Sequence, residues 1–105
     1  MSAKLVKFIF TQGQKQAWLD WSKELQRRKD EVIQTLKNEG VISEACFISE
    51  DGESVYYYME AADFEKVKKS VQESPFPIDL EHKEICGASL EFVEELKPLF
   101  YFKSE

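Results

Sequence analysis

Short β segments with apolar residues on both faces constrain the fold of this chain more than any other feature. The sequence predicts four strands, at Lys4–Phe10, Val41–Ser49, Ser54–Glu60 and Pro98–Lys103. Side chains along a strand alternate between the two faces of its sheet. In the third strand Val55, Tyr57 and Met59 therefore point one way, and Tyr56 and Tyr58 point the other way. Because the chain has enough helix to cover one face only, we expect a second copy to cover the other, as a homodimer.

One long helix is predicted between the first two strands, from about Gln14 to Asn38. Gly40 follows as its C-cap, the position where a left-handed residue commonly ends a helix. The apolar residues recur at helical spacing and form one stripe. These residues are Trp18, Trp21, Leu25, Val32 and Leu36.

The second half of the chain contains a hairpin and two further helices in our prediction. Asp51-Gly52 lies between two β segments, a strong hairpin signal. A short helix runs from the N-cap Asp63 to Glu73. A third helix begins at an N-cap, Asp79, and ends near Leu96, before Pro98 opens the last strand.

The predicted order is β-α-β-β-α-β, with the second crossover split in two. This order is typical of an α+β, ferredoxin-like sandwich, in which helices cover one face of an antiparallel sheet. At 105 residues the chain forms one domain over 1–105.

Charge and composition exclude several classes of partner. The net charge of −6 argues against a nucleic-acid partner, which requires a basic face. No apolar run approaches the roughly 20 residues needed to cross a bilayer, so we expect no membrane partner. Cys46 and Cys86 are far apart and form neither a metal-ligand pair nor a CxxC motif. We therefore expect a cytoplasmic protein with reduced thiols, no metal and no cofactor.

His82 and Arg28 are the first two candidates for a site. His82 is the single histidine, and imidazole is the usual acid or base near neutral pH, although lone histidines also serve structural roles. Arg28 lies on the apolar stripe of the first helix. It either extends along its apolar stem to solvent or binds an anion in a cavity between helix and sheet.

Polar residues within the predicted strands form a third set. They are Lys7, Glu44 and Glu60, accompanied by Tyr56, Tyr58 and Tyr101. Charges are common on edge strands. Alternatively, these residues line a small-molecule pocket, with Glu44 or Glu60 as acid or base and a tyrosine as hydrogen-bond partner. Trp18 and Trp21 either wall this pocket or pack in the core.

Parts of the chain resemble a known family. The stretches Asn38–Phe47 and Tyr56–Glu60, followed by Asp63–Glu65, are similar to the middle of L-rhamnose mutarotases, which are dimeric α/β barrels of the ferredoxin-like type. The chain resembles an uncharacterised bacterial family of that superfamily more closely. That family shares a segment like Asp79–Lys83 and a hydrophobic last strand. The resemblance implies a dimeric α/β barrel.

The chain also departs from the mutarotase pattern. In mutarotases a histidine on the first helix follows a basic pair and serves the sugar, whereas Lys29 follows Arg27 and Arg28 here. A solvated lysine is protonated at neutral pH and cannot accept a proton as imidazole does. The paired tryptophans near the end of mutarotases are replaced by Ile78-Asp79-Leu80. These differences argue against sugar epimerisation by the same mechanism.

Three functions stay open at this point. The chain is a dimeric barrel that binds a small organic ligand, which is the reading we favour. Alternatively, it is an enzyme of mutarotase or cofactor-free monooxygenase type, using His82, Glu44 or Glu60, and Tyr56 or Tyr58. The third possibility is a structural or regulatory dimer with a filled interior. The first two functions require a cavity lined by these polar groups.

Overall fold

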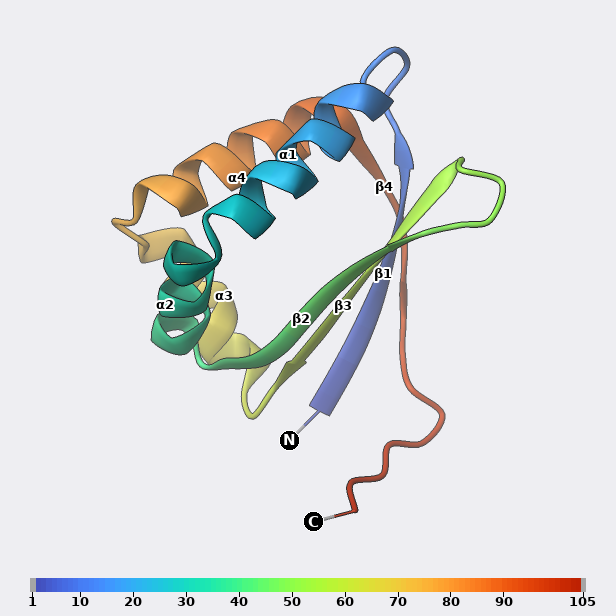
Figure 1. Cartoon of the computed structure of the whole chain (residues 1–105). Helices are drawn as coiled ribbons and strands as arrows, with labels where there is room; N and C mark the ends of the chain where they lie inside the picture. Colours follow the sequence, from blue (N-terminus) through green and yellow to red (C-terminus); the bar gives the residue numbers. More distant parts are fainter. Residues whose placement is uncertain (1, 105) are drawn as a thin grey trace.

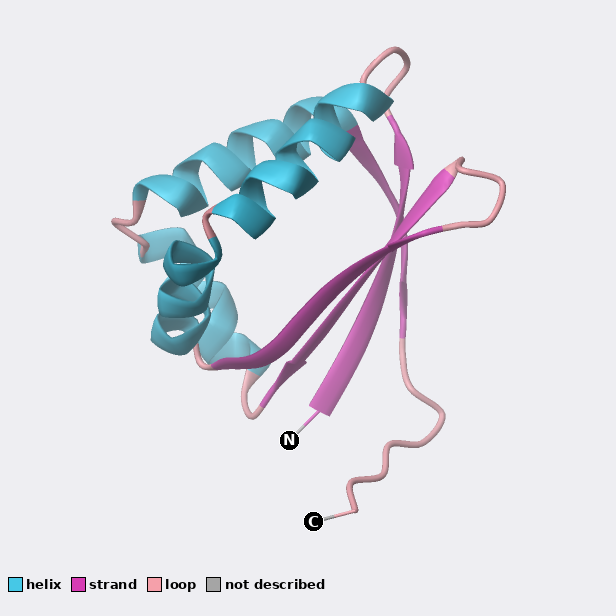
Figure 2. Cartoon of the chain, viewed as in Figure 1, coloured by secondary structure: helices cyan, strands magenta, loops and turns pink. Residues whose placement is uncertain are grey.

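The computed structural model describes residues 2–104 as a sheet with helices packed on one of its faces (Figures 1 and 2). Its elements follow one another along the chain as β1 (Ser2–Phe10), α1 (Lys15–Arg27), α2 (Lys29–Glu39), β2 (Val41–Ile48), β3 (Ser54–Ala61), α3 (Phe64–Glu73), α4 (Pro77–Ser89) and β4 (Leu90–Leu96). The sheet has the strand order β2-β3-β1-β4, and each neighbouring pair is antiparallel. The predicted α+β, ferredoxin-like class is confirmed.

The predicted long helix is two helices, with a break at Arg28. The backbone of Arg28 leaves helical geometry at φ −101° and ψ 36°. Its N–H still donates to the carbonyl of Glu24, and its own carbonyl accepts from the N–H of Val32. The break therefore leaves neither of these groups without a hydrogen-bond partner. The change of direction allows α1 to pack on α4 while α2 packs on α3 and β2.

The structure confirms the predicted hairpin and two of the three predicted helix caps. Gly40 ends α2 with φ 80°, and Gly52 takes φ 74° in the hairpin turn. Asp63 caps α3 by accepting hydrogen bonds from the N–H groups of Glu65 and Lys66. Asp79 is not an N-cap, because α4 begins two residues earlier, at Pro77. Proline fits the first turn of a helix, where its missing N–H has no partner to lose.

The prediction for the C-terminal region is wrong. The last strand is Leu90–Leu96, which was predicted as helix, and Pro98–Lys103 is an irregular tail instead of a strand. Leu90 and Phe92 pair with Phe10 and Phe8 of β1, so alternate apolar residues of β4 extend the covered side of the sheet. The glutamates between them favour helix by propensity, but this tertiary pairing prevails.

Strand register decides which residues face the helices. Tyr57 of β3 pairs with Val6 and Cys46 on the side that the helices pack against, which we call the covered face. Tyr56 and Tyr58 lie on the opposite side, which we call the outer face, as period-2 alternation requires. The outer face also carries Leu5, Lys7, Ile9, Ala45, Phe47, Glu60 and Leu96.

The core between helices and sheet has two parts. The larger part is centred on Trp18, Trp21, Val55, Ile78 and Leu90. The smaller part contains Val41, Ala61 and Val67. The predicted apolar stripe of the first helix is confirmed, since all five of its residues pack into one of these clusters. In the described part of the chain, no helix is long and apolar enough to span a bilayer.

Candidate functional site

Four side chains from four elements meet beneath α1 on the covered face. Trp21 comes from α1, Glu44 from β2, Tyr57 from β3 and His82 from α4. The apolar periodicity of α1 turns Trp21 inward, and strand alternation places Glu44 and Tyr57 on the same face of the sheet. The fold therefore assembles these groups from positions up to 61 residues apart.

Hydrogen bonds join the four side chains into one chain of contacts. The indole N–H of Trp21 donates to Nδ1 of His82 at 2.9 Å. Nε2 of His82 lies 3.3 Å from the hydroxyl of Tyr57, which donates to Oε1 of Glu44 at 2.5 Å. Because indole is a donor only, Nδ1 must be the acceptor and the proton of neutral His82 must lie on Nε2. His82 therefore donates to Tyr57. We call this chain the Trp21–Glu44 relay.

Burial shifts every titratable group of the relay toward its neutral form. It lowers the pKa of His82, against the opposing field of Asp79. It raises the pKa of Glu44, although the hydrogen bond from Tyr57 acts in the opposite direction. Burial, with the Glu44 carboxylate beside it, holds the pKa of Tyr57 well above its usual value. Both Glu44 and His82 are thus displaced from their ordinary pKa values by burial, as is common for groups at functional sites.

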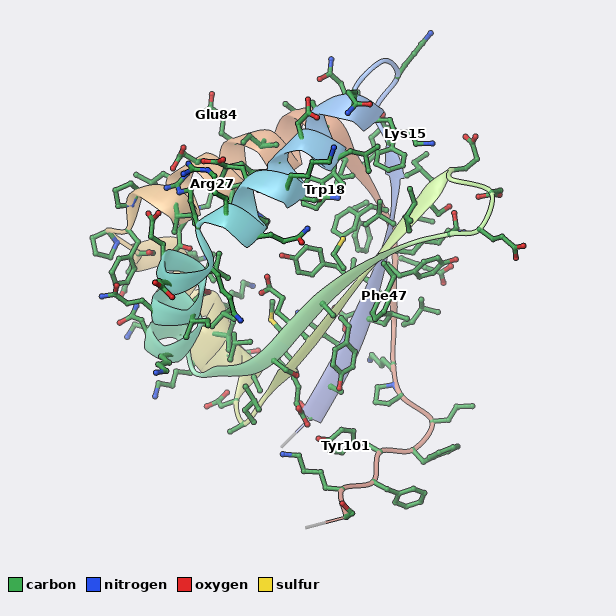
Figure 3. All side chains as sticks on the ribbon, viewed as in Figure 1. Lys15, Trp18, Arg27, Phe47, Glu84 and Tyr101 are labelled. Carbon is green, nitrogen blue, oxygen red and sulfur yellow. The ribbon has the colours of Figure 1, made fainter. Side chains whose placement is uncertain are left out.

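Aromatic rings hold the imidazole of His82 in place. The ring centroids of Trp18, Tyr57 and Trp21 lie 5.8, 6.0 and 6.1 Å from that of His82. Trp18 lies on α1 (Figure 3) and is only 2% exposed, so its ring is almost inaccessible to solvent. This packing fixes the ring of His82 in addition to its hydrogen bonds.

A cavity of about 710 Å³ borders the relay. Its walls are mainly apolar and include Phe10, Trp18, Leu25, Val32, Ile48 and Val55. Its polar lining comprises Ser22, Gln26, Lys29, Glu44 and Tyr57. His82 and Trp21 do not line the cavity, so within residues 2–104 Glu44 and Tyr57 are the members of the relay that a ligand can touch.

Cys46 also lines this cavity, next to Tyr57 across the strand pair. Burial raises the pKa of its thiol to about 11, although the residue as a whole is exposed on the edge strand. A thiol with a raised pKa is a poor nucleophile. Cys46 therefore contributes apolar surface to the cavity.

A second polar cluster lies between α2 and the start of α4. The hydroxyls of Thr35 and Ser74 both contact Oδ2 of Asp79, and Thr35 also lies 3.3 Å from Oε1 of Glu39. Burial, with the charges of Asp79 and Glu44, raises the pKa of Glu39 to about 7. Because the single Thr35 proton cannot serve both carboxylates, a proton on Glu39 completes the cluster.

Arg28 is held by carboxylates outside the cavity. Its guanidinium lies 2.8 Å from Glu31 and 2.8 Å from Glu81, the residue before His82. The same group stands over the ring of Trp21 at 5.9 Å. Arg28 therefore ties the α1–α2 junction to the segment of α4 that carries His82. These carboxylates already occupy donors of the guanidinium. Binding of an anion by Arg28 stays a prediction.

The structure separates the predicted site residues into two groups. Trp18, Trp21, Glu44 and His82 come together on the covered face. Apart from Arg28 at the α1–α2 junction, the others lie on the outer face or in the tail: Lys7, Tyr56, Tyr58, Glu60 and Tyr101.

The outer-face group has contacts of its own. Lys7 stands over the ring of Tyr56 at 5.9 Å. Glu60 accepts a hydrogen bond from Ser43 at 3.2 Å and lies 3.8 Å from the ammonium of Lys103 in the tail.

Tyr57 belongs to the candidate site but is not among the candidates predicted from the sequence. It lies between the two tyrosines chosen as candidates, and its alternation with them was visible in the sequence. Which of the two faces would carry the helices was not. Among the described residues, no group of three or more histidines, cysteines or acidic residues is arranged to hold a metal ion.

Comparison with known proteins agrees with this fold. The structure is similar to that of L-rhamnose mutarotase from Formosa agariphila, with a TM-score of 0.66 and 19% identity over 98% of this chain and 100% of that chain. It is also similar to Rv0793 from Mycobacterium tuberculosis, with a TM-score of 0.62 and 14% identity over 98% and 100% of the two chains. Likeness at these identities shows the fold and leaves function to the site.

Sequence comparison places the chain in a family. No curated protein matches its sequence. A family model described as a family of unknown function, DUF6176, matches residues 1–103. The resemblance predicted from the sequence, to an uncharacterised family distantly similar to L-rhamnose mutarotase, is confirmed. The chain belongs to the DUF6176 family.

Proposed function

We propose that this protein binds a small organic ligand in the cavity between α1, α2 and the covered face, with Glu44 as the acid or base that contacts it. The Trp21–Glu44 relay is the observation that supports the proposal. The hydroxyl of Tyr57 is occupied on both sides, by His82 and by Oε1 of Glu44. Oε2 of Glu44 is the relay oxygen left for a ligand, and His82 acts as a positioning residue behind Tyr57.

Ligand binding is tested with two probes of opposite polarity, phenol and L-rhamnose. Titration followed by amide shifts in two-dimensional NMR should show saturable changes at Glu44, Cys46 and Tyr57 for at least one probe. The variant Ser22→Phe places a ring in the cavity without burying a charge, and it should remove those changes. If neither probe shifts these amides in the natural sequence, or if Ser22→Phe leaves the shifts intact, the proposal fails.

A mutarotase-like activity is the second candidate. It is favoured by the structural likeness to L-rhamnose mutarotase together with a carboxylate in the cavity. In this chemistry a base takes the proton of the anomeric hydroxyl while an acid protonates the ring oxygen. The bond from the anomeric carbon to the ring oxygen breaks, a carbonyl forms, and the ring closes again on the other face. Here Glu44 serves as base and the Lys29 ammonium as acid.

Anomer exchange of L-rhamnose measured by magnetisation transfer tests this candidate. We expect Glu44→Gln to reduce catalysed exchange by at least about 100-fold, which is typical for removing a general base. Glu60→Gln is the matched control. Because Glu60 lies on the outer face, this variant should retain the exchange activity of the natural protein. Exchange that is no faster with the natural protein than in buffer would exclude mutarotation of this sugar.

We further propose that a second copy covers the outer face. Ile9 and Phe47 are exposed on this face, and Leu99, Phe100 and Phe102 are exposed in the tail beside it. Exposed apolar residues gathered on one side of a molecule commonly mark an interface. Ile9→Glu should convert the dimer to monomer in analytical ultracentrifugation. Leu80→Glu, which changes an exposed leucine on α4, should not. A natural protein that sediments as a 12.3 kDa monomer at micromolar concentration would exclude the dimer.

A further inference from the structure

We propose a second binding site, for a small amphiphile with an anionic head group, in a lysine-rimmed cavity at the opposite end of the covered face from the hairpin. This cavity has a volume of about 850 Å³. It shares no lining residue with the cavity of about 710 Å³ that borders the Trp21–Glu44 relay, which we call the relay cavity. It lies between α3, β1 and the segment that follows β4. Its ligand is therefore independent of the function proposed for the relay cavity.

The floor of this cavity is apolar. Met59 of β3 and Phe64, Val67 and Val71 of α3 line it, and all four belong to the smaller core cluster. Val67 is buried, while Phe64 and Val71 are half-buried. An apolar body placed on this floor would remove these half-exposed side chains from water, which is favourable in proportion to the area covered. The floor thus suits a hydrocarbon chain or ring.

The rim carries four lysines from four parts of the fold. They are Lys4 of β1, Lys68 of α3, Lys83 of α4 and Lys97 after β4. The acidic residues of the lining are Glu65 and Glu95, so the cavity has an excess of positive charge in a chain of net charge −6. An excess of one sign in a concave site attracts ligands of the opposite sign.

Most of this positive charge is available to a ligand. Lys4 is partly engaged, because its ammonium lies 4.0 Å from Glu95 and 4.8 Å from the centre of the Phe64 ring. Lys68, Lys83 and Lys97 are exposed, and within residues 2–104 none of them forms an ion pair. Three lysines with free ammonium groups around an apolar floor match an anionic head joined to an apolar body.

Octanoate and octan-1-ol form a matched pair of probes, with the same chain length and a different head group. Each is titrated into the full chain while two-dimensional NMR follows the amides of α3. We expect saturable shifts in α3 with both probes. Octanoate should bind about threefold to tenfold more tightly, as expected for two partly exposed charge contacts. Added sodium chloride should reduce this difference.

Paired lysine variants test where the preference comes from. Lys68→Gln with Lys83→Gln should reduce octanoate affinity to that of octan-1-ol and leave octan-1-ol binding unchanged. Lys23→Gln with Lys37→Gln removes the same charge from exposed positions outside both cavities and should bind octanoate like the natural protein. Ser22→Phe, which fills the relay cavity, should also leave octanoate binding unchanged.

Four results would overturn this second site. The first is octanoate binding no more tightly than octan-1-ol to the natural protein, and the second is an octanoate advantage that survives undiminished in the Lys68→Gln, Lys83→Gln variant. Alternatively, the protein could cosediment with phosphatidylglycerol vesicles and show no octanoate shifts in α3, which would indicate a membrane surface instead of a soluble amphiphile. Loss of octanoate binding in Ser22→Phe would place the probe in the relay cavity and contradict the second site alone.

Discussion

The two faces of the sheet carry similar residues but differ in how far these residues are buried and hydrogen-bonded. On the covered face Tyr57 is locked between His82 and Glu44, and Trp18 is 2% exposed. On the outer face Tyr56 and Tyr58 are half-buried, and Phe47 is 57% exposed. One residue along a strand separates a buried hydrogen-bonded tyrosine from a neighbour at the surface. Position on a face, more than residue type, therefore decides which tyrosine joins the buried hydrogen-bonded cluster.

Two buried glutamates show the same contrast. Glu39 belongs to α2, in the helix layer, and Glu60 lies on the outer face; they are 6% and 7% exposed. Glu60 has a cation nearby, Lys103, and a hydroxyl donor, Ser43. Glu39 is surrounded by other acids, with one shared hydroxyl. Burial and the neighbouring acids therefore raise the pKa of Glu39 to about 7, so it keeps a proton to higher pH than an ordinary glutamate.

The largest contrast is expected between core and tail. Trp18→Ala should lower the free energy of unfolding by about 3–5 kcal/mol, because it leaves a cavity in the larger core cluster. Leu99→Ala, at a residue that is 98% exposed, should change it by less than about 0.5 kcal/mol in dilute solution. Urea denaturation measures both. If Leu99→Ala lowers the free energy of unfolding by an amount that grows with protein concentration, the tail takes part in the dimer interface.

The second contrast concerns pH. Between pH 4.5 and about 7 the folded chain holds a proton on Glu39 that the unfolded chain has released. Stability should therefore fall as pH rises through this window, by at most about 3.5 kcal/mol at roughly 1.4 kcal/mol per pKa unit. Glu44, whose pKa is also raised, adds in the same direction.

His82 acts in the opposite direction and must be separated from this effect. Its lowered pKa means that the unfolded chain binds a proton that the folded chain lacks, so its contribution rises with pH up to about 6.5. The difference between the natural protein and Glu39→Gln isolates Glu39. Denaturation curves from pH 4.5 to 7.5 should show this difference decreasing as pH rises. A constant difference would mean that Glu39 ionises as an ordinary glutamate.

The third contrast uses neighbouring tyrosines. Tyr57→Phe removes the hydroxyl that joins His82 and Glu44, and leaving these buried groups without a partner should cost about 1–3 kcal/mol. Tyr58→Phe makes the same chemical change on the outer face and should cost less than about 0.5 kcal/mol. Thermal and urea unfolding of both variants measure the pair. Equal losses would show that the relay adds nothing to stability.

The smallest effect is expected at the ion pair between Lys103 and Glu60. Lys103→Met should lower the free energy of unfolding by about 1 kcal/mol or less, as is usual for a partly exposed pair. The effect should shrink in high salt. Lys69→Met, an exposed lysine of α3, is the control. Equal effects of the two changes would show that the tail does not use Lys103 to hold Glu60.

Most of the fold was predictable from local signals. Asp51-Gly52, Gly40 and Asp63 each require the turn or cap that the structure contains. The last strand was not predictable in this way. Leu90–Leu96 contains Glu91, Glu94 and Glu95 and has helical propensity, while the aromatic tail after Pro98 has strand propensity. Pairing with β1 decides between them, and such long-range pairing is not encoded in a local window.

The candidate site was predictable in part. Burial of Trp18 and Trp21 follows from the helical stripe, and the sequence analysis named Glu44 and His82 as candidates. Their contact through Tyr57 depends on which sheet face receives the helices. Strand alternation separates Tyr57 from Tyr56 and Tyr58 but does not say which set is covered, since both sets are aromatic.

The protonation state of His82 tests the central claim most directly. The chain has one histidine, so its two imidazole nitrogens give one set of signals in long-range ¹H–¹⁵N correlation spectra. We predict a neutral ring at pH 7 with its proton on Nε2, a pKa below 6.5, and a Trp21 indole N–H signal shifted by its bond to Nδ1. A proton on Nδ1, or titration with an ordinary pKa, would contradict the relay and the site built on it.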